Sequence, residues 1–356
     1  MKCLLLLALI CCDILTGTDG CRPSPGPSNP KKPPTIDGDH LLIGGGWGEK
    51  HKSLKDMYAL DIKTGQLTTV YKDAPYYLHF VTYSKNGQVL FKSAYTDGLD
   101  GKGKVNKGSV IYDGSNWSGA VEPKAVYEKT QHITFFNGAL MGDKYYMCNR
   151  PSRESLEMQC FAYDFALGLW ETVFEGPDNL PAKLDVYSMV AYGDKLYLVA
   201  QHAGSIIYSM ATFEPKTKQW QLIGQLPFYS LFFKTVGLRA ADGKDYLMSC
   251  GASTMYVTEC WVYDLRKGEW AKGPAISDDS QINDFSMLNC AGDVYAVGGE
   301  AIGEVDGDTR DHRRELLSSI YVLEASKSPL RWRKMDAQLP VARQIAMAVC
   351  VDSKKN

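Results

Sequence analysis

The sequence has little that would tie the protein to a membrane interior or to nucleic acid. After the signal-like start, no apolar run approaches the roughly 20 consecutive residues that a bilayer-spanning helix needs. The formal net charge is −2, with 39 basic and 41 acidic side chains. The chain therefore lacks the clustered excess of Lys and Arg that is typical of nucleic-acid-binding domains. We expect neither a membrane span nor a nucleic-acid partner.

The sequence also lacks the short motifs of common enzymes. It contains no Gly-rich phosphate-binding loop, no His-Glu-x-x-His metalloprotease motif and no Gly-x-Ser-x-Gly nucleophile elbow. No catalytic residue can be named on this basis. The composition, with 45% hydrophobic and 22% charged residues, is that of a folded globular protein.

What is present begins with a predicted secretory signal peptide, residues 1–20. Met1-Lys2 is a charged start, Cys3 to Leu15 is an apolar core too short for an anchor, and Thr18-Asp19-Gly20 supplies small residues for cleavage. The alternative is a buried N-terminal helix. Residues 21–38 are rich in Pro, which favours an extended linker. We therefore expect a secreted, extracellular protein whose folded domain spans residues 39–356.

Two sequence marks recur at intervals of about fifty residues. The first is a dipeptide suited to a tight hairpin turn, found at Asn86-Gly87, Gly142-Asp143, Gly193-Asp194, Asp242-Gly243 and Gly292-Asp293. The second is an acidic residue followed by Trp, as in Asp164 to Trp170, Glu214 to Trp220 and Asp264 to Trp270. These marks predict six copies of a four-stranded unit and an all-β fold.

One copy, from Cys290 to Trp332, resembles the kelch repeat of the galactose oxidase-like central domain. It contains the double glycine Gly298-Gly299, an aromatic strand and a spaced Trp332. The resemblance implies a six-bladed β-propeller with four-stranded blades. His40 to Gly46 matches a second strand, whereas Gln344 to Asp352 matches a lone first strand. We therefore expect the C-terminal strand to complete the first blade and close the ring. Other six-bladed propellers remain open for the middle copies, which have other residues in place of the double glycine.

Seven cysteines remain after the signal peptide. Cys148 and Cys160, and again Cys250 and Cys260, lie at the facing ends of consecutive strands, so each pair can form a disulfide in an oxidising compartment. Buried free thiols are the alternative. Cys290 and Cys350 occupy matching places in two first strands, and we expect both to be free and buried. Cys21 is left over and can form an intermolecular disulfide.

The longer loops lie on one face of the implied propeller, where loops on a rigid scaffold commonly bind ligands. The candidate binding residues on this long-loop face are His51, Arg150, Arg153, His202, Tyr229, Asp278, Asp279, Arg310 and Arg313. The charged stretch from Glu300 to Glu315 is longer than other links from a second to a third strand, such as His202 to Ser205. We expect it to lie beside the segment Ser277 to Ser280.

Glu304, Asp308 and His312 are each four residues apart. This spacing resembles the Glu-x3-Asp-x3-His iron site of kelch-type specifier proteins, so a divalent metal is one interpretation and a solvated charged loop is the other. No other cofactor is expected. Asn116-Trp117-Ser118 is the one sequon, so Asn116 is the predicted glycosylation site.

Two classes of function remain open. The first, which we favour, is a secreted, monomeric and non-enzymatic binding module that recognises an extracellular protein or glycan through the long-loop face. The alternative is an extracellular kelch-fold enzyme that acts on a small sugar or a metal-dependent substrate. An enzyme would require perturbed ionisable groups to cluster in a depression.

Overall fold

The computed structural model describes residues 39–75, 82–85, 88–94, 108–120, 138–149, 159–175, 184–202, 207–228, 234–254, 257–277, 281–303 and 313–351. All of these belong to one compact unit, Pro34–Asn356. The predicted signal peptide and the Pro-rich linker lie outside the described residues. Within the described ranges the one helix is η1 (Glu49–His51), and no helix there has the length and apolar character needed to span a membrane.

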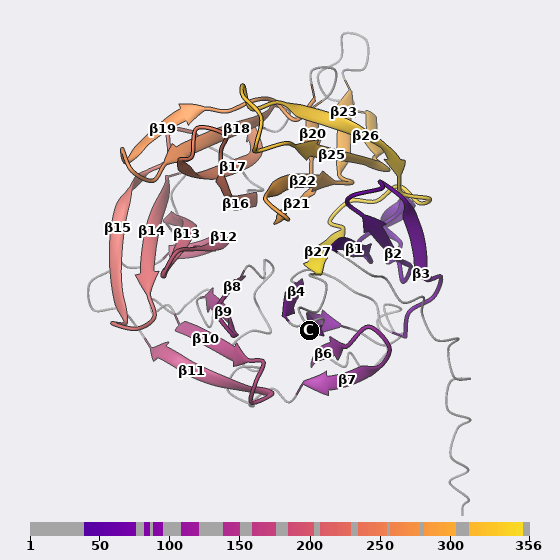
Figure 1. Ribbon diagram of the computed structural model, residues 1–356, viewed down its shortest axis with the longest axis horizontal. Helices are drawn as coiled ribbons and strands as arrows, with labels where there is room; N and C mark the ends of the chain where they lie inside the picture. Colours follow the sequence, from indigo (N-terminus) through magenta and orange to yellow (C-terminus); the bar gives the residue numbers. More distant parts are fainter. Residues whose placement is uncertain are drawn as a thin grey trace, which may run out of the picture. The chain divides into compact units, whose positions relative to one another are not determined.

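The described strands form six four-stranded antiparallel sheets, numbered here along the chain (Figure 1). Sheet one joins the last strand to the first three, in the order β27 (Met347–Val351), β1 (His40–Gly44), β2 (Met57–Asp61) and β3 (Leu67–Tyr71). Sheet two is β4 (Thr82–Lys85), β5 (Gln88–Ala94), β6 (Gly108–Tyr112) and β7 (Trp117–Ala120). Sheet three is β8 (Gly138–Met141), β9 (Lys144–Asn149), β10 (Gln159–Asp164) and β11 (Leu169–Glu175).

The second half of the chain continues the same meander. Sheet four is β12 (Leu184–Tyr192), β13 (Lys195–His202), β14 (Tyr208–Glu214) and β15 (Gln219–Gln225). Sheet five is β16 (Lys234–Arg239), β17 (Asp245–Thr254), β18 (Val257–Asp264) and β19 (Glu269–Lys272). Sheet six is β21 (Ser286–Cys290), β22 (Asp293–Val297), β25 (Ser319–Leu323) and β26 (Trp332–Gln338). A separate three-stranded sheet contains β20 (Gln281–Asn283), β23 (Glu300–Gly303) and β24 (Arg313–Leu316).

In sheets one, two, three and five, the Asp at the end of the third strand organises the turn into the fourth strand. Asp164 Oδ1 accepts hydrogen bonds from the backbone N–H groups of Ala166 and Leu167, at 2.9 and 3.1 Å. Asp61 and Asp264 bind the corresponding N–H groups in their own turns. These backbone donors lower the pKa of both carboxyls below its usual value. The acidic mark in the sequence is therefore the signature of a side chain that holds a turn.

In sheets two to five, the Trp that opens the fourth strand packs on an aromatic residue of the third strand. The ring centroids of Phe213 and Trp220 are 4.6 Å apart in a stacked arrangement, and those of Tyr263 and Trp270 are 5.1 Å apart. In both cases the two residues are direct cross-strand partners. Aromatic pairs of this kind add about 0.5–1.5 kcal/mol beyond their buried area, which explains the fixed spacing between the acidic residue and the Trp.

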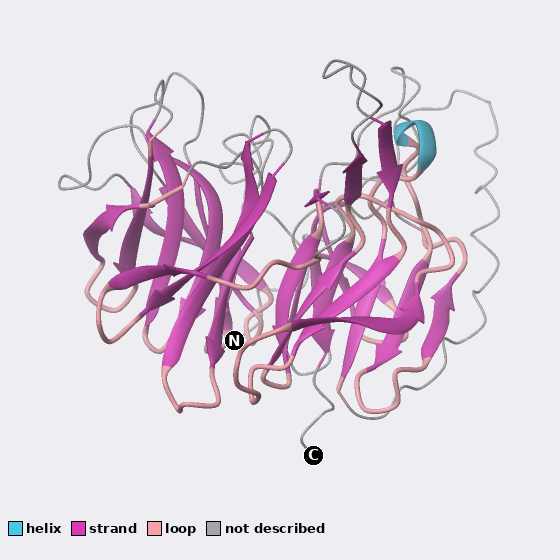
Figure 2. Cartoon of the chain, turned by 90° about the horizontal axis from the view of Figure 1, so that it is seen from above, coloured by secondary structure: helices cyan, strands magenta, loops and turns pink. Residues whose placement is uncertain are grey.

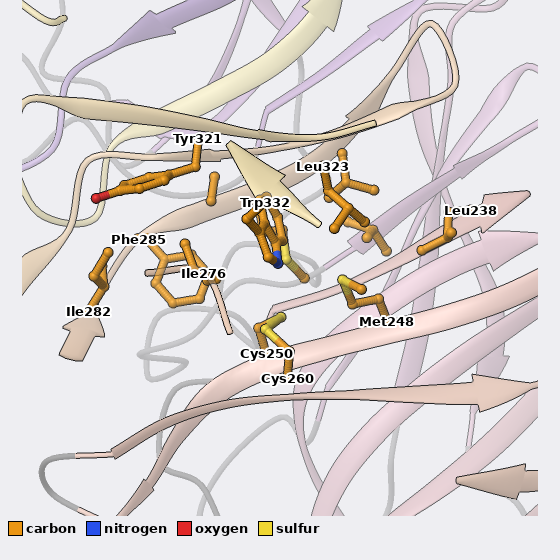
Figure 3. Close-up of a cluster of buried hydrophobic side chains, with 14 of the residues drawn as sticks. Leu238, Met248, Cys250, Cys260, Ile276, Ile282, Phe285, Tyr321, Leu323 and Trp332 are labelled. Atoms are coloured by element: carbon orange, nitrogen blue, oxygen red, sulfur yellow. A yellow bond between two sulfur atoms is a disulfide. The ribbon is translucent and has the colours of Figure 1, made fainter. Parts of the chain in front are cut away.

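The first strand of each sheet lies beside the first strands of its neighbours, in the order β4, β27, β21, β16, β12 and β8. These inner strands lie nearest the middle in Figure 1. Apolar side chains fill the space between neighbouring sheets. Between sheets five and six, Trp332 lies among Met248, Leu323 and Tyr321, with Cys250 beside them (Figure 3).

The last strand completes the first sheet, as predicted. β27 pairs antiparallel with β1, in a register that sets Gly44 opposite Met347 and His40 opposite Val351. The other edge of β1 pairs with β2. Without β27, β1 would present a row of unpaired backbone groups, so this pairing removes an exposed sheet edge.

Two disulfides form the pairs that the sequence predicts. Cys148 joins Cys160 and Cys250 joins Cys260, with Cα atoms 4.0 and 4.1 Å apart. In both pairs the cysteines are direct partners on the second and third strands. In sheet six, Val297 and Ile320 hold the corresponding positions. The disulfides of sheets three and five thus occupy the position that the apolar pair Val297 and Ile320 holds in sheet six.

The expectation that Cys290 and Cys350 are free thiols is wrong. They form a third disulfide, with Cα atoms 5.2 Å apart and a sequence separation of 60 residues. Cys290 ends β21 and Cys350 lies in β27, and these inner strands belong to neighbouring sheets. The two cysteines occupy matching positions in neighbouring inner strands, and for this reason their sulfur atoms lie close enough to bond. The three disulfides are compatible with an extracellular location.

Candidate functional site

The long-loop end of the sheets carries the connections from second to third strands and from one sheet to the next. In sheet six the connection from β22 to β25 contains β23 and β24, so the stretch predicted as a loop from Glu300 to Glu315 begins and ends in strands. β23 pairs with β24 on one side and with β20 on the other. β20 directly follows the predicted neighbouring segment, and Gln281 lies opposite Ile302. In sheet one, the corresponding connection contains η1, drawn cyan in Figure 2.

Hydrogen bonds fasten this three-stranded sheet to sheets five and six and to the connection that precedes β27. Thr258 Oγ1 donates to the carbonyl of Ile282 at 2.5 Å and accepts from its N–H at 2.8 Å. Gly299 N–H donates to the carbonyl of Arg343 at 2.8 Å. Gly298 N–H donates to the carbonyl of Ser319 in β25 at 3.0 Å. The base of the hairpin is therefore a built part of the fold.

Sheet one contains a reduced copy of the same arrangement. Trp47 forms isolated bridges with Ser53 and with Gln344, as Glu300 pairs with Leu316 and with Asn283. The double glycines allow a close approach in both copies. A Cβ atom on Gly46 would lie 2.6 Å from the carbonyl oxygen of Gln344, and one on Gly299 would lie 2.6 Å from that of Asn283. Both glycines also have positive φ, at 76° and 108°.

A buried ion pair lies at the junction of these two copies, and sequence reasoning missed it. Arg343 is fully buried, and its Nη1 and Nη2 donate to Asp56 Oδ1 and Oδ2 at 2.8 and 2.7 Å. Arg343 also donates to the carbonyls of Gly45 and Val341. Tyr58 donates to Asp56 Oδ2 at 2.6 Å, and its ring lies 5.4 Å from the guanidinium carbon. Burial, reinforced by the hydrogen bond to Asp56, raises the pKa of Tyr58 to about 12. The sequence holds one signal of this pair: Asp56 and Arg343 are charged residues of opposite sign, and each lies shortly before an apolar strand.

An electrostatic interaction links Lys234 of sheet five to Asp284, which lies ahead of sheet six. Lys234 begins β16, and burial lowers the pKa of its ammonium group below its usual value, although the charge of Asp284 acts in the opposite direction. By register, Lys234 occupies the position that Ser286 has in sheet six. Ser286 reaches forward and hydrogen-bonds the carbonyl of Ala346, ahead of β27. The electrostatic interaction of Lys234 with Asp284 runs, like the Ser286 hydrogen bond, from an inner strand to the residues that precede the next inner strand.

Three of the candidate binding residues can be placed in the fold. His51 ends η1, and Arg313 begins β24 opposite Gly303. His202 ends β13, is half-buried, and its Nε2 lies 2.9 Å from Ser209 Oγ. The other candidates lie outside the described residues: Arg150, Arg153, Tyr229, Asp278, Asp279 and Arg310.

The predicted metal ligands Glu304, Asp308 and His312 also lie outside the described residues. Among the residues that the structure describes, no three His, Cys, Asp or Glu side chains are grouped so that they could hold a metal ion.

The predicted glycosylation site lies in the turn between β6 and β7. Asn116 is exposed, and its backbone N–H donates to Asp113 Oδ1 at 2.7 Å. Its side-chain Nδ2 lies 3.4 Å from Asp113 Oδ2, and Ser118 is also exposed. Turns between third and fourth strands lie at the end of the sheets opposite to the long-loop end. A glycan on Asn116 would therefore leave the long-loop end uncovered.

The chain matches no family model, and no curated protein matches it.

Proposed function

We propose that the protein is a secreted binding module, built on a six-bladed kelch-type β-propeller, that recognises an extracellular protein or glycan through its long-loop face. The six four-stranded sheets, the neighbouring inner strands and the pairing of β27 with β1 support this architecture. The proposed ring requires β8 to lie beside β4. Closure of the first blade by the last strand is the usual way in which a propeller protects its edges.

Secretion rests on the signal-like N-terminus and on cysteine usage. Disulfides persist in oxidising compartments and are rare in the cytosol. Six of the seven cysteines that follow the signal-like segment are paired in the structure. A charged hairpin on a disulfide-stabilised scaffold suits recognition outside the cell.

One observation carries the binding proposal. At the equivalent place in sheet one, two isolated bridges at Trp47 stand where the three-stranded sheet has three paired strands. The fold therefore does not require the full length of β23 and β24. The stem of this three-stranded sheet is nevertheless anchored to the neighbouring connections through Thr258, Gly298 and Gly299. Ordering a long segment costs conformational entropy that it recovers only through contacts. We infer that the hairpin between β23 and β24 is held in place to meet a partner.

The test replaces residues 304–312 by a short Gly-Ser link and keeps the pairing of Ile302 with Arg314. The parent and the shortened protein are used as baits in the extracellular fluid of the source tissue. We expect a partner that the parent captures and the shortened protein loses, with unchanged melting of the bait. The matched control is a Gly-Ser replacement within the exposed turn at residues 215–218, at the opposite end of sheet four. Equal capture by all three baits would contradict a binding role for the hairpin.

The alternative, an extracellular enzyme, is favoured by the altered pKa of Lys234, because perturbed ionisable groups cluster at active sites. The equivalent position of Ser286 favours a structural role instead. The substitution Lys234→Met separates the two. A structural role predicts a lower melting temperature with partner capture retained, whereas a catalytic role predicts an unchanged melting temperature.

A further inference from the structure

Two side-chain amides on β20 each hold a buried oxygen without a hydrogen-bond donor. Gln281 Oε1 and Asn283 Oδ1 are both buried, and neither accepts a hydrogen bond from the described part of the chain. Asn283 is only 7% exposed as a whole. An unsatisfied buried acceptor costs about 1–3 kcal/mol. Two such atoms on a strand of three residues therefore indicate that something binds them.

The register of the sheet brings a carboxylate to the same place. Residues 281 and 283 are two positions apart in β20, so their side chains lie on the same face of the sheet. Asn283 lies directly opposite Glu300 in the antiparallel pairing. Opposite side chains in such a pair have Cβ atoms about 4.5–5.5 Å apart. Glu300 is 6% exposed. Two amide oxygens and one carboxylate thus share one enclosed side of the sheet.

We propose that Gln281, Asn283 and Glu300 bind a Ca²⁺ ion that fastens the stem of the hairpin. Ca²⁺ takes about six to eight oxygen ligands from carboxylates, Asn and Gln carbonyls, backbone carbonyls and water. These side chains supply three oxygens, or four if Glu300 binds through both. The enclosed position suits an ion better than a sugar or a partner side chain. Extracellular sites of this kind bind Ca²⁺ with a Kd of about 0.1–1 mM. The proposal shares only the extracellular location with the proposed function.

The reduced copy in sheet one shows why the site is specific to the three-stranded sheet. There Trp47 takes the place of Glu300, and Gln344 takes the place of Asn283. An indole cannot supply a hard anionic ligand, so the copy in sheet one lacks the charge that Ca²⁺ requires. Of these two copies, only the three-stranded sheet combines the carboxylate with extended strands.

The test is a calcium titration of the full secreted chain, followed by calorimetry and by melting in chelator or in about 5 mM Ca²⁺ or Mg²⁺, several times the expected Kd. We expect binding of one Ca²⁺ and a higher melting temperature in Ca²⁺ than in Mg²⁺. Asn283→Ala and Glu300→Gln should each weaken Ca²⁺ binding by about tenfold or more. Gln281→Ala, at a less buried position, serves if either variant does not fold. The matched control is Asn289→Ala, which removes an amide that donates to the carbonyl of Gly237 at 3.0 Å and should leave Ca²⁺ binding unchanged.

Three results would overturn the proposal. The first is a parent protein that melts identically in chelator and in Ca²⁺, with Asn283→Ala at least as stable as the parent, which would indicate a buried water. The second is Ca²⁺ binding that all of these variants retain, which would place the ion elsewhere, such as at the acidic residues 304–312. The third is equal stabilisation by Mg²⁺ and Ca²⁺. None of these results depends on whether a partner is captured.

Discussion

Arg343 and Asp56 form a bidentate ion pair across 287 residues of sequence, with Arg343 completely buried. The guanidinium fork matches the two carboxylate oxygens, and two further N–H groups donate to the carbonyls of Gly45 and Val341. Arg343 precedes β27, and Asp56 precedes β2. The pair therefore holds the connection that leads into the last strand against the start of the second strand of the same sheet.

Breaking this pair should strongly destabilise the protein. Arg343→Met leaves the Asp56 carboxylate without its counter-charge in a buried site, and we expect a loss of about 3–5 kcal/mol in the free energy of unfolding. The measurement is urea unfolding followed by fluorescence. Asp73→Asn is the matched control, because Asp73 is exposed and lies 3.8 Å from Lys55. A loss for Arg343→Met no larger than that of the control would contradict this role.

The Cys290–Cys350 disulfide should contribute more to stability than the two shorter ones. It closes a loop of 60 residues, against 12 and 10 for the others. In the chain-entropy model a loop of this length contributes about 4 kcal/mol, and the short loops contribute about 2–3 kcal/mol. We expect Cys290→Ala/Cys350→Ala to melt at a lower temperature than Cys250→Ala/Cys260→Ala. Peptide mapping under non-reducing conditions checks the pairing first, and free thiols at these two positions would refute it.

Tyr58 should ionise late as the pH rises. Its pKa is raised from 10.0 to about 12, first by burial and then by the hydrogen bond to Asp56. Because the folded-state value exceeds the unfolded one, the neutral phenol stabilises the fold fully below pH 10.0, and this contribution is lost as the pH rises through about 12. Tyr58→Phe should therefore reduce the increase in phenolate absorbance that the parent protein shows as the pH rises through about 12. An unchanged titration curve in this variant would show that Tyr58 is not one of the late groups.

Asn116 should carry a glycan when the chain is expressed through a secretory pathway. The residue is exposed in a turn, and Trp117 beside it packs on Tyr112 with ring centroids 4.9 Å apart, so Asn116→Gln changes the sequon without touching the core. We expect Asn116→Gln to lower the mass by that of one glycan, with little change in melting temperature. Asn86→Gln, outside any sequon, serves as the control and should keep the glycan. A parent protein without a glycan would contradict both the modification and the secretory route.

Features that depend on neighbours along the chain could be predicted from the amino-acid sequence. Turn dipeptides such as Gly193-Asp194 and the acidic residues that hold the next turns predict four-stranded units, because hairpins form between consecutive strands. The cysteines of sheets three and five were predictable for the same reason. The incomplete first and last copies also indicated the pairing of β27 with β1.

The contacts between sheets could not be predicted in this way. Cys290 and Cys350, and likewise Arg343 and Asp56, are separated by long stretches, and no local pattern records which inner strands become neighbours. The pairing of β20 with β23 depends in the same way on how sheets five and six meet. Alternation and turn chemistry act within a sheet, whereas the distance between two sheets is set by the side chains packed between them. The proposed calcium site lies at such a junction, and for that reason the sequence did not reveal it.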